Sequence, residues 1–432
     1  MNRKLIIILV AAFLIRLIAL NQSLWLDEGT TAKVIRDFSY SAIITRFSPT
    51  DFHPPLFYLT EKFWASFFGT SEIALRMPSV LYSLLAGWLL YLMGGIWAAV
   101  FFLFNPLIVY YSQEARMYMM VTFLLTAAVY YFIKILRING LTNLLLFTLF
   151  SVLSFYMFYG SIFLIIPLYV YLLYRKKHHA FIISASIFGV SLLIISPLLY
   201  RQLMNSREAL KIVANWKQAL GTANLKNLLL IPLKFAFGRI SFYPKWLYWG
   251  LAGIWTVFIW FLVIKNGLKQ KFYLYLLGGS LVIGLLFSVF SPLLQYFRFL
   301  FLVPLMAMLL GNKKLSPVYC YIVAAGFLVL SFAYLLNPQF HREDWKSLAK
   351  SLPANAPIYA IPSSMDALTY YKNIHIDDLR KINQAVNGKL VVIPYTADIY
   401  GLDYKKSLVD EGYKPDKTVN FRGVQMEEWS KL

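Results

Sequence analysis

Two adjacent carboxylates, Asp27 and Glu28, are the residues of this sequence whose type and position most directly suggest chemistry. They lie in segment 24–29, directly after the first long apolar run of the chain. Ionisable groups are costly at the edge of a hydrocarbon layer, so an acidic pair fixed there predicts a functional site. A simpler interpretation is that both acids begin a helix, because acidic residues stabilise a helix N-terminus.

A second cluster of reactive residue types is the segment Gln113-Glu114-Ala115-Arg116-Met117-Tyr118, which lies between two apolar runs. Glu114 and Arg116 are two positions apart, so on a helix they would point to different sides rather than pair with each other. A simple surface salt bridge between them is therefore disfavoured.

Four further ionisable side chains are candidates. His53 precedes two prolines that fix the backbone, and a rigid turn with an exposed histidine would explain it equally well. Snorkelling of the side chain toward the membrane surface explains Arg76 and Arg298 without a functional role. Arg16 lies inside an apolar run, about three helical turns from Asp27, and stays a candidate substrate-binding residue.

The composition predicts that these residues belong to a polytopic α-helical membrane protein. Hydrophobic residues make up 59% of the chain, charged residues only 14%, and the mean hydropathy is +0.61, which excludes an ordinary soluble core. The N-terminal run is expected to be a retained helix, since no small-x-small cleavage pattern follows it. About 11 transmembrane helices are expected near residues 5–20, 75–92, 96–112, 117–135, 142–158, 160–174, 180–200, 244–264, 272–290, 296–310 and 315–336.

The distribution of charge predicts the orientation. With the N-terminus inside, the inner loops hold twelve Lys or Arg and no Asp or Glu, and they comprise residues 2–4, 93–95, 134–143, 175–179, 265–271 and 312–314. All twenty acidic residues then lie outside, as the positive-inside rule requires. This partition explains the net charge of +21, so no nucleic-acid partner is expected.

Chemistry is therefore expected on the outer side of the cytoplasmic membrane. Segments 21–74 and 201–243 predict short outer interfacial helices. Residues 338–432 form a small soluble C-terminal α/β domain in this prediction, beside a transmembrane domain of residues 1–337. Its strand-like runs are 358–361, 390–393 and 419–421, and its helix-like runs are 344–351, 365–372 and 404–411.

Taken together, the motifs resemble those of the clan C integral-membrane glycosyltransferases, in particular the bacterial relatives of the dolichyl-phosphate-mannose protein mannosyltransferases and of the lipid A aminoarabinose transferases. The resemblance covers nearly the whole chain, and the order of the motifs makes it specific. They are Trp25-Leu26-Asp27-Glu28, His53-Pro54-Pro55-Leu56-Phe57-Tyr58, Ser71-Glu72-Ile73-Ala74-Leu75-Arg76-Met77-Pro78-Ser79, Gln113-Glu114-Ala115-Arg116-Met117-Tyr118 and Tyr296-Phe297-Arg298-Phe299.

The resemblance implies a hexosyl- or pentosyltransferase that takes its sugar from a polyprenyl-phosphate donor. Asp27 matches the family's first-loop acid and would be the general base, with Glu28 as its alternative or its orienting neighbour. Arg116 and Arg298 would bind the departing phosphate, because their planar forks suit its oxygens. Single displacement with inversion at the sugar is implied as well.

The remaining candidates would complete the site. Tyr118 and His53 would line the sugar. Glu114 would hold a divalent cation or a substrate hydroxyl, because some relatives use a metal and others do not; no other cofactor is expected. The expected partners are the polyprenyl-phosphate-linked sugar, membrane lipids and an acceptor, which is a lipid, a glycan or a protein.

Two other classes of protein remain as alternatives. A transporter or flippase for a lipid-linked saccharide would place charged residues near the bilayer midplane on broken helices, ideally in two matching halves. A non-catalytic scaffold would not need Asp27, Glu114 or Arg298. Among enzymes, the nearest rival is a polymerase or ligase that uses a diphosphate-linked donor.

Overall fold

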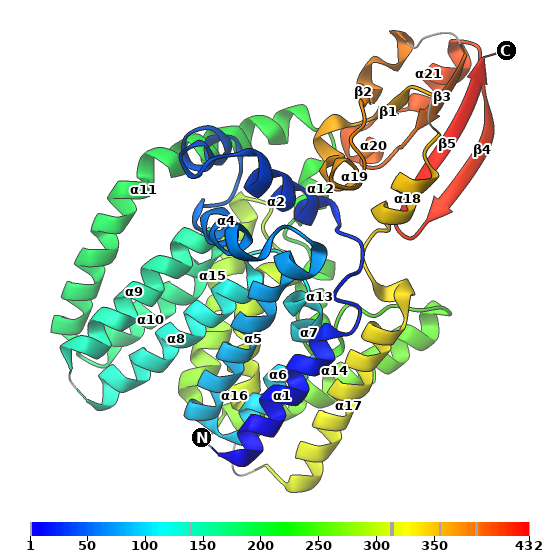
Figure 1. Ribbon diagram of the computed structural model, residues 1–432. Coiled ribbons are helices and arrows are strands. Elements are labelled where there is room, and N and C mark those ends of the chain that lie inside the picture. The colour runs from blue at the N-terminus through cyan, green and yellow to red at the C-terminus, as the bar shows by residue number, and fades with distance from the viewer. Residues whose placement is uncertain (1, 139, 312–314, 354–355, 385–387, 432) are drawn as a thin grey trace.

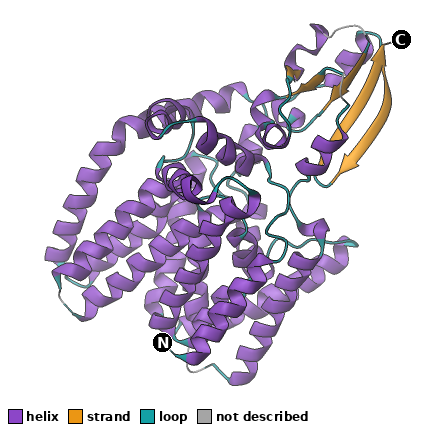
Figure 2. Cartoon of the chain, in the orientation of Figure 1, coloured by secondary structure: helices purple, strands orange, loops and turns teal. Residues whose placement is uncertain are grey.

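The computed structural model describes residues 2–138, 140–311, 315–353, 356–384 and 388–431 of the 432-residue chain. A large bundle of helices carries a small part with a sheet at one end (Figures 1 and 2). The N-terminus lies at the opposite end of the bundle from the C-terminus (Figure 1). The expected inner-loop residues 312–314 lie outside the described residues.

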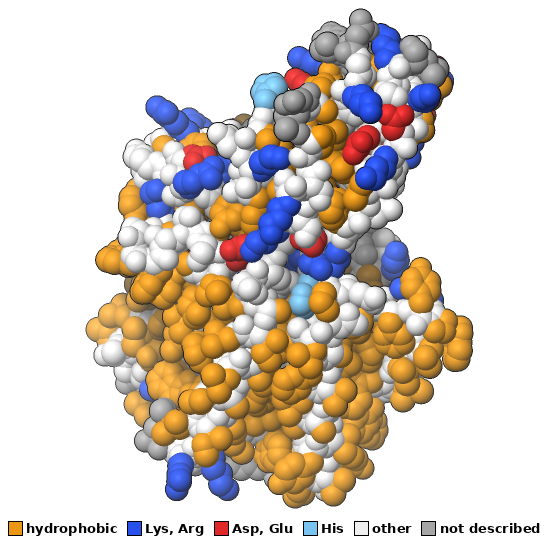
Figure 3. Space-filling model, turned by 45° about the vertical axis from the view of Figure 1, so that its right-hand side comes forward, with side chains coloured by type: hydrophobic (Ala, Val, Ile, Leu, Met, Phe, Trp, Pro, Cys, Tyr) orange, Lys and Arg blue, Asp and Glu red, His pale blue; other side chains and the backbone are white. Residues whose placement is uncertain are grey.

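Six described helices are long and apolar enough to cross a membrane: α5 (Glu72–Gly94), α8 (Tyr118–Arg137), α11 (His178–Ile212), α14 (Lys245–Gly267), α15 (Lys271–Phe290) and α17 (Pro317–Leu336). Their outward-facing side chains are apolar and exposed, as the 73% exposure of both Leu193 and Ile254 illustrates. Figure 3 shows these side chains as a broad apolar surface, with charged groups concentrated above it and basic groups below it. The protein is therefore a multi-pass membrane protein.

The other expected spans are shorter helices: α1 (Arg3–Leu17), α9 (Leu141–Met157), α10 (Ile162–Tyr174), and a 3-10 segment η4 (Tyr296–Leu302) that continues into α16 (Val303–Leu310). The expected single span 96–112 is wrong, because it is divided into α6 (Ile96–Leu103) and α7 (Pro106–Ser112). Asn105 caps α7 by accepting hydrogen bonds from the backbone of Leu107 and Ile108, and Pro106 cannot continue the preceding helix. The count of about eleven spans stays a prediction.

Short helices cover the end of the bundle that carries the sheet. They are α2 (Leu26–Asp37), α3 (Tyr40–Ala42), α4 (Leu56–Phe68), α12 (Trp216–Leu220) and α13 (Leu225–Phe237), with the π-helical turn η1 (Ile43–Phe47). The expected span 180–200 lies within α11, and this helix continues beyond residue 200 to Ile212. Its 35 residues measure about 50 Å, which exceeds the thickness of the hydrocarbon layer. Figure 1 shows α11 bending across this end of the bundle, and Pro197 lies inside it.

The C-terminal part is a five-stranded sheet with the strand order β2-β1-β3-β5-β4. The strands are β1 (Ile358–Ala360), β2 (Asp377–Asp378), β3 (Lys389–Val392), β4 (Tyr413–Phe421) and β5 (Val424–Lys431). β1 pairs in parallel with β2 and β3, whereas β5 pairs antiparallel with β3 and β4. The helices are α18 (Trp345–Ser351), α19 (Asp366–Tyr371), α20 (Ala397–Tyr400) and α21 (Tyr404–Asp410).

The expected strands and helices of this domain are confirmed, but the sequence did not reveal β2, β5 or α20. For β5 the reason is Glu427, which is only 4% exposed and interrupts the apolar alternation of the strand. Its carboxylate accepts hydrogen bonds from Tyr404 and Trp429, which makes its burial tolerable.

The sheet domain docks on α2 through α19. Asp366 accepts a hydrogen bond from Thr30 at 2.9 Å and pairs with Lys33 at 2.8 Å. Between these contacts Gly29 lies so close to the backbone of Ala367 that a Cβ atom at position 29 would collide with it. The C-terminal domain is thereby held against the helix that carries both adjacent carboxylates.

Candidate active site

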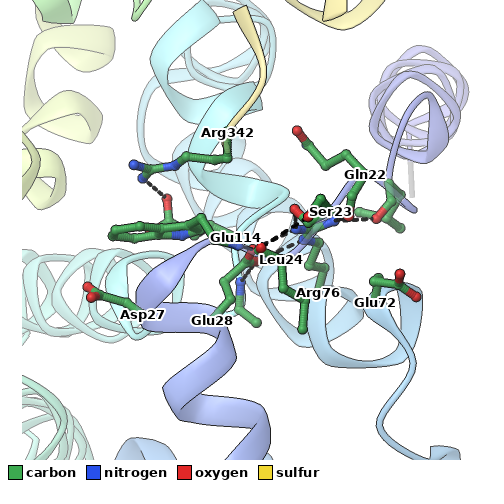
Figure 4. Close-up of polar contacts among 12 residues, drawn as sticks. Gln22, Ser23, Leu24, Asp27, Glu28, Glu72, Arg76, Glu114 and Arg342 are labelled. Carbon is green, nitrogen blue, oxygen red and sulfur yellow. Dashed lines mark hydrogen bonds and ion pairs between the residues drawn. The ribbon is translucent and has the colours of Figure 1, made fainter. Parts of the chain in front are cut away.

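The two adjacent carboxylates lie in the first turn of α2, whose N-cap is Trp25. The expectation that they begin a helix is therefore correct for their position. Glu28 also satisfies a backbone donor at the start of the helix, since its Oε2 accepts a hydrogen bond from the backbone N–H of Trp25 at 3.3 Å. The two side chains nevertheless have different surroundings, because Glu28 points toward Arg76 and Asp27 points away from that contact (Figure 4).

Glu28 forms a fully buried ion pair with Arg76 of α5. Arg76 donates from Nε to Oε1 at 2.8 Å and from Nη2 to Oε2 at 2.6 Å, and both side chains are 1% exposed. The backbone N–H of Ala115 donates to the same Oε1 at 2.8 Å. Both oxygens of Glu28 are thus occupied by donors, and its charge is neutralised inside the protein.

Arg76 also fixes the loop before α2. It donates to the backbone carbonyls of Leu20, Gln22 and Ser23 at 2.6 to 3.0 Å (Figure 4). The snorkelling interpretation of Arg76 is therefore wrong, since a side chain that is 0% exposed does not reach toward water. Arg76 instead ties α5 to the first outer loop and, through Glu28, to α2.

Asp27 is the accessible carboxylate of the pair, with 35% of its side chain exposed. Its Oδ2 lies 3.6 Å from Nη2 of Arg116, which is itself only 4% exposed. Arg116 donates from Nη1 to the hydroxyl of Tyr58 at 3.3 Å, and its guanidinium lies 5.9 Å from the ring of Phe57. Burial lowers the pKa of Arg116, but the charges of Asp27 and the nearby tyrosines outweigh it and raise the pKa above its usual value.

Arg298 lies in η4, next to Phe297. It donates from Nη1 to the carbonyl of Pro292 at 3.0 Å, and it lies within electrostatic range of Tyr118 and Asp27. The ring of Tyr118 packs edge-on against Phe297 at 5.5 Å. The structure thus gathers Asp27, Arg298 and Tyr118 from three segments that are far apart in sequence.

His53 belongs to the same region through Asp51. Its Nδ1 lies 3.5 Å from Oδ1 of Asp51, and the backbone carbonyl of His53 accepts a hydrogen bond from Gln202 of α11. Burial would raise the pKa of Asp51, but His53 and the nearby Arg116 together leave it below its usual value. His53 is therefore held beside Asp51, which lies within electrostatic range of Arg116, rather than being a free surface histidine.

Glu114 pairs with a cation from the C-terminal domain, since Nη2 of Arg342 donates to its Oε2 at 2.8 Å (Figure 4). Burial raises the pKa of Glu114; Arg342 opposes this shift and Glu28 adds to it, and the pKa remains above its usual value. Glu114 and Arg116 have different partners, as their spacing predicted.

The surroundings of Glu114 do not fit a resident divalent cation, because its nearest charged partner is a guanidinium. Within the part of the chain that the structure describes, no group of three or more His, Cys, Asp or Glu could hold a metal ion. Glu114 is therefore assigned as the ion-pair partner of Arg342 and not as a metal ligand.

Arg16 is occupied elsewhere. It is 0% exposed and donates to the backbone carbonyls of Ala12 at 2.8 Å and Leu103 at 2.8 Å. These bonds tie α1 to the end of α6, so the described contacts of Arg16 are with the backbone rather than with the Asp27 site.

Three arginines at the junction of the two domains were missed by the sequence analysis. Arg239, Arg342 and Arg422 line a cavity of about 230 Å³ together with Tyr110. Arg342 stacks on the ring of Trp25 at 3.8 Å, and Arg239 donates to the hydroxyl of Tyr110 at 2.7 Å. Nothing in their local sequence distinguishes them from ordinary basic residues of outer loops.

Comparison with known proteins identifies the fold. No protein-family model matches the chain, and the comparison with curated protein sequences found no match. Two solved structures of ArnT from Cupriavidus metallidurans are similar, each with 13% sequence identity over 98% of this chain and 97% of that one. The TM-score is 0.61 for the apo state and 0.58 for the structure bound to undecaprenyl phosphate. The chain therefore has the GT-C glycosyltransferase fold, which confirms the fold that the motif resemblance implies.

Proposed function

We propose that the protein is a membrane glycosyltransferase that moves a sugar from a polyprenyl-phosphate donor to an acceptor hydroxyl. The observation that carries this proposal is the partly exposed carboxylate of Asp27, which lies 3.6 Å from the buried guanidinium of Arg116 and within electrostatic range of Arg298. The fold supports it, since a structure with this fold was solved with bound undecaprenyl phosphate. Fold alone does not carry function, so the argument depends on the site.

The reaction needs a base for the acceptor hydroxyl and cations for the leaving phosphate. Asp27 accepts the proton of the acceptor hydroxyl as the new bond forms from that oxygen to the anomeric carbon. The bond from the anomeric carbon to the phosphate oxygen breaks, and polyprenyl phosphate leaves with the electron pair. Arg116 and Arg298 stabilise the negative charge that develops on the leaving phosphate. A single displacement of this kind inverts the anomeric centre.

The neighbouring residues would then position these groups. Glu28 holds the start of α2 against Arg76, so we assign it as the orienting neighbour of Asp27 and not as the base. Tyr118 and His53 would line the sugar. Glu114, paired with Arg342, would link the segment that carries Arg116 to the C-terminal domain.

The site is proposed to face the outside of the cytoplasmic (inner) membrane, with the N-terminus inside. Single cysteines introduced at Lys269 and at Lys350 test this orientation in a Cys320→Ala background, which contains no other cysteine. Lys350, in α18, should react with an impermeant maleimide in intact cells, whereas Lys269 should react only after permeabilisation. The reverse pattern would contradict the proposed location of the site.

The activity itself is tested with the purified protein in liposomes that contain undecaprenyl-phosphate-linked sugars. A glycosyltransferase releases undecaprenyl phosphate when an acceptor extract is present. A flippase, the alternative from another class, moves the intact lipid-linked sugar to the other leaflet without cleaving it. Translocation without cleavage would exclude the proposal.

A further inference from the structure

The C-terminal domain contains a cavity that no step of the proposed reaction uses. It has a volume of about 400 Å³ and lies where β3 ends and the β4–β5 hairpin turns. Its lining includes Tyr395, Thr396, Asn420, Phe421 and Gln425. Crevices beyond the carboxyl ends of parallel strands are common ligand sites in α/β sheets.

The lining of the cavity is uncharged and combines polar side chains with aromatic rings. Asn420 and Gln425 offer carboxamides, which both donate and accept hydrogen bonds, and Thr396 offers a hydroxyl. Tyr395 and Phe421 offer rings, and none of the cavity's lining residues is charged. Paired donors and acceptors beside a ring suit the hydroxyl groups and apolar faces of a neutral saccharide better than they suit a phosphate or a purely apolar ligand.

Side-chain contacts connect the lining of this cavity to the segment that carries Asp27. Thr396 donates to the hydroxyl of Ser364 at 2.8 Å, which joins the segments that follow β3 and β1. The hydroxyl of Tyr395 donates to Glu343 at 3.3 Å, and the neighbouring Arg342 stacks on Trp25. Trp25 is two residues before Asp27.

The charge of the proposed base also acts on a residue of the cavity lining, Tyr395. Burial raises the pKa of Tyr395, and the negative charges of Glu343 and Asp27 raise it further. On its other side the same part of the domain contacts the outer segment after α11, because Asn215 donates to the backbone of Asp398 and Ile399 in α20. The domain that contains the cavity is thus held by contacts with the segment before Asp27 and with the segment after α11.

We infer that this cavity is the subsite for the saccharide part of the acceptor, with Asn420 and Gln425 as specificity-determining residues supplied by the C-terminal domain. The inference rests on the proposed glycosyl transfer, because in that reaction Asp27 takes its proton from the acceptor hydroxyl. Neither amide touches the groups that perform the reaction, so both are binding residues and not catalytic ones.

The test measures binding of neutral methyl glycosides of glucose, galactose, mannose and N-acetylglucosamine to the full-length protein in nanodiscs, by saturation-transfer difference NMR. Asn420→Ala is the diagnostic variant, since Asn420 lines the cavity and is exposed. Asn373→Ala is the matched control, because Asn373 is an exposed amide of the same domain that is not among the lining residues. Binding of undecaprenyl phosphate is measured on the same preparations.

At least one glycoside should bind the wild type and Asn373→Ala equally, and it should bind Asn420→Ala with about fivefold lower affinity, as expected for the loss of one hydrogen bond. Undecaprenyl phosphate should bind all three alike. Equal glycoside binding by Asn420→Ala, or no glycoside binding by the wild type, would overturn the inference while leaving the proposed function intact. A wild type that fails to bind undecaprenyl phosphate would instead count against the proposed function.

Discussion

Arg76 and Glu28 join two parts of the chain 48 positions apart through two hydrogen bonds of 2.8 and 2.6 Å, at a depth where neither side chain is more than 1% exposed. The pair fixes the first turn of α2, in which Asp27 directly precedes Glu28. The orientation of the proposed base therefore depends on a buried ion pair that does not itself contact substrate in our proposal.

Glu28→Gln should lower the stability of the folded protein. Arg76 would keep its charge while losing its only carboxylate among the described contacts, and breaking a buried pair in this way costs about 3–5 kcal/mol. The measurement is thermal unfolding of the purified variant in detergent. Glu208→Gln is the control, because its ion pair with Lys211 is exposed and contributes little. Equal unfolding temperatures for Glu28→Gln and the wild type would show that the pair is not a structural support.

Gly29→Ala should loosen the docking of the C-terminal domain on α2, because the added Cβ would collide with the backbone of Ala367. The expected results are faster proteolytic cleavage between the two domains and reduced transfer activity. Gly278→Ala serves as the matched control, since Gly278 is also helical and a Cβ there meets no atom within 4 Å. Equal cleavage rates and equal transfer activities for the two variants would show that the close approach of α19 to α2 does not matter for domain docking or for activity.

Glu61 on α4 should make stability depend on pH. Burial, reinforced by the charge of Glu28, raises its pKa well above the usual value. The folded protein then holds one proton more than the unfolded chain between the two pKa values, so stability falls as the pH rises through that window. The slope is about 1.4 kcal/mol per pH unit.

Glu61→Gln keeps a neutral side chain at every pH, and its stability should lack this slope and exceed that of the wild type at neutral and alkaline pH. Unfolding by denaturant at a series of pH values, from the usual glutamate pKa upward, measures the difference. Parallel pH profiles for the two proteins would show that Glu61 is ionised in the fold.

The sequence predicted the elements but not most of the partners of the site residues. The period and length of the apolar runs identified the helices, and the strand-like runs of the C-terminal domain identified β1, β3 and β4. The pairing of Glu28 with Arg76 and that of Glu114 with Arg342 could not be read from the chain, since they join residues 48 and 228 positions apart. Position in a motif is visible in one sequence, whereas a long-range partner depends on packing.

The break of the expected span 96–112 has a local cause that the sequence does contain. Asn105-Pro106 is a helix start, with an asparagine cap followed by a proline at the first helical position. The surrounding apolar residues hid it, because hydropathy alone does not distinguish one long helix from two short ones.

Replacing either arginine of the proposed phosphate site should weaken donor binding. Arg116→Ala and Arg298→Ala should each cost about 2–5 kcal/mol in affinity for undecaprenyl phosphate, because the negative charge of the bound phosphate would lose a cationic partner. Lysine at either position should restore binding only in part, because it lacks the planar fork.

Binding titrations in detergent measure both effects. Arg175→Ala is the control, as this exposed arginine lies at the end of α10, in the loop predicted to be on the inner side. Donor affinity equal to that of the wild type in both alanine variants, with normal folding, would assign Arg116 and Arg298 to structure.

The most direct test of the proposed mechanism is the rate of sugar transfer by Asp27→Asn with undecaprenyl-phosphate-linked sugar as the donor. Donor binding is measured on the same preparation. Asparagine preserves the shape of the side chain and serves equally well at a helix start, so the fold of α2 should survive. Loss of the base should reduce the rate about 10²–10⁴-fold while donor affinity stays near that of the wild type. Full activity of Asp27→Asn would contradict the assignment of Asp27 as the general base and, with it, the proposed mechanism.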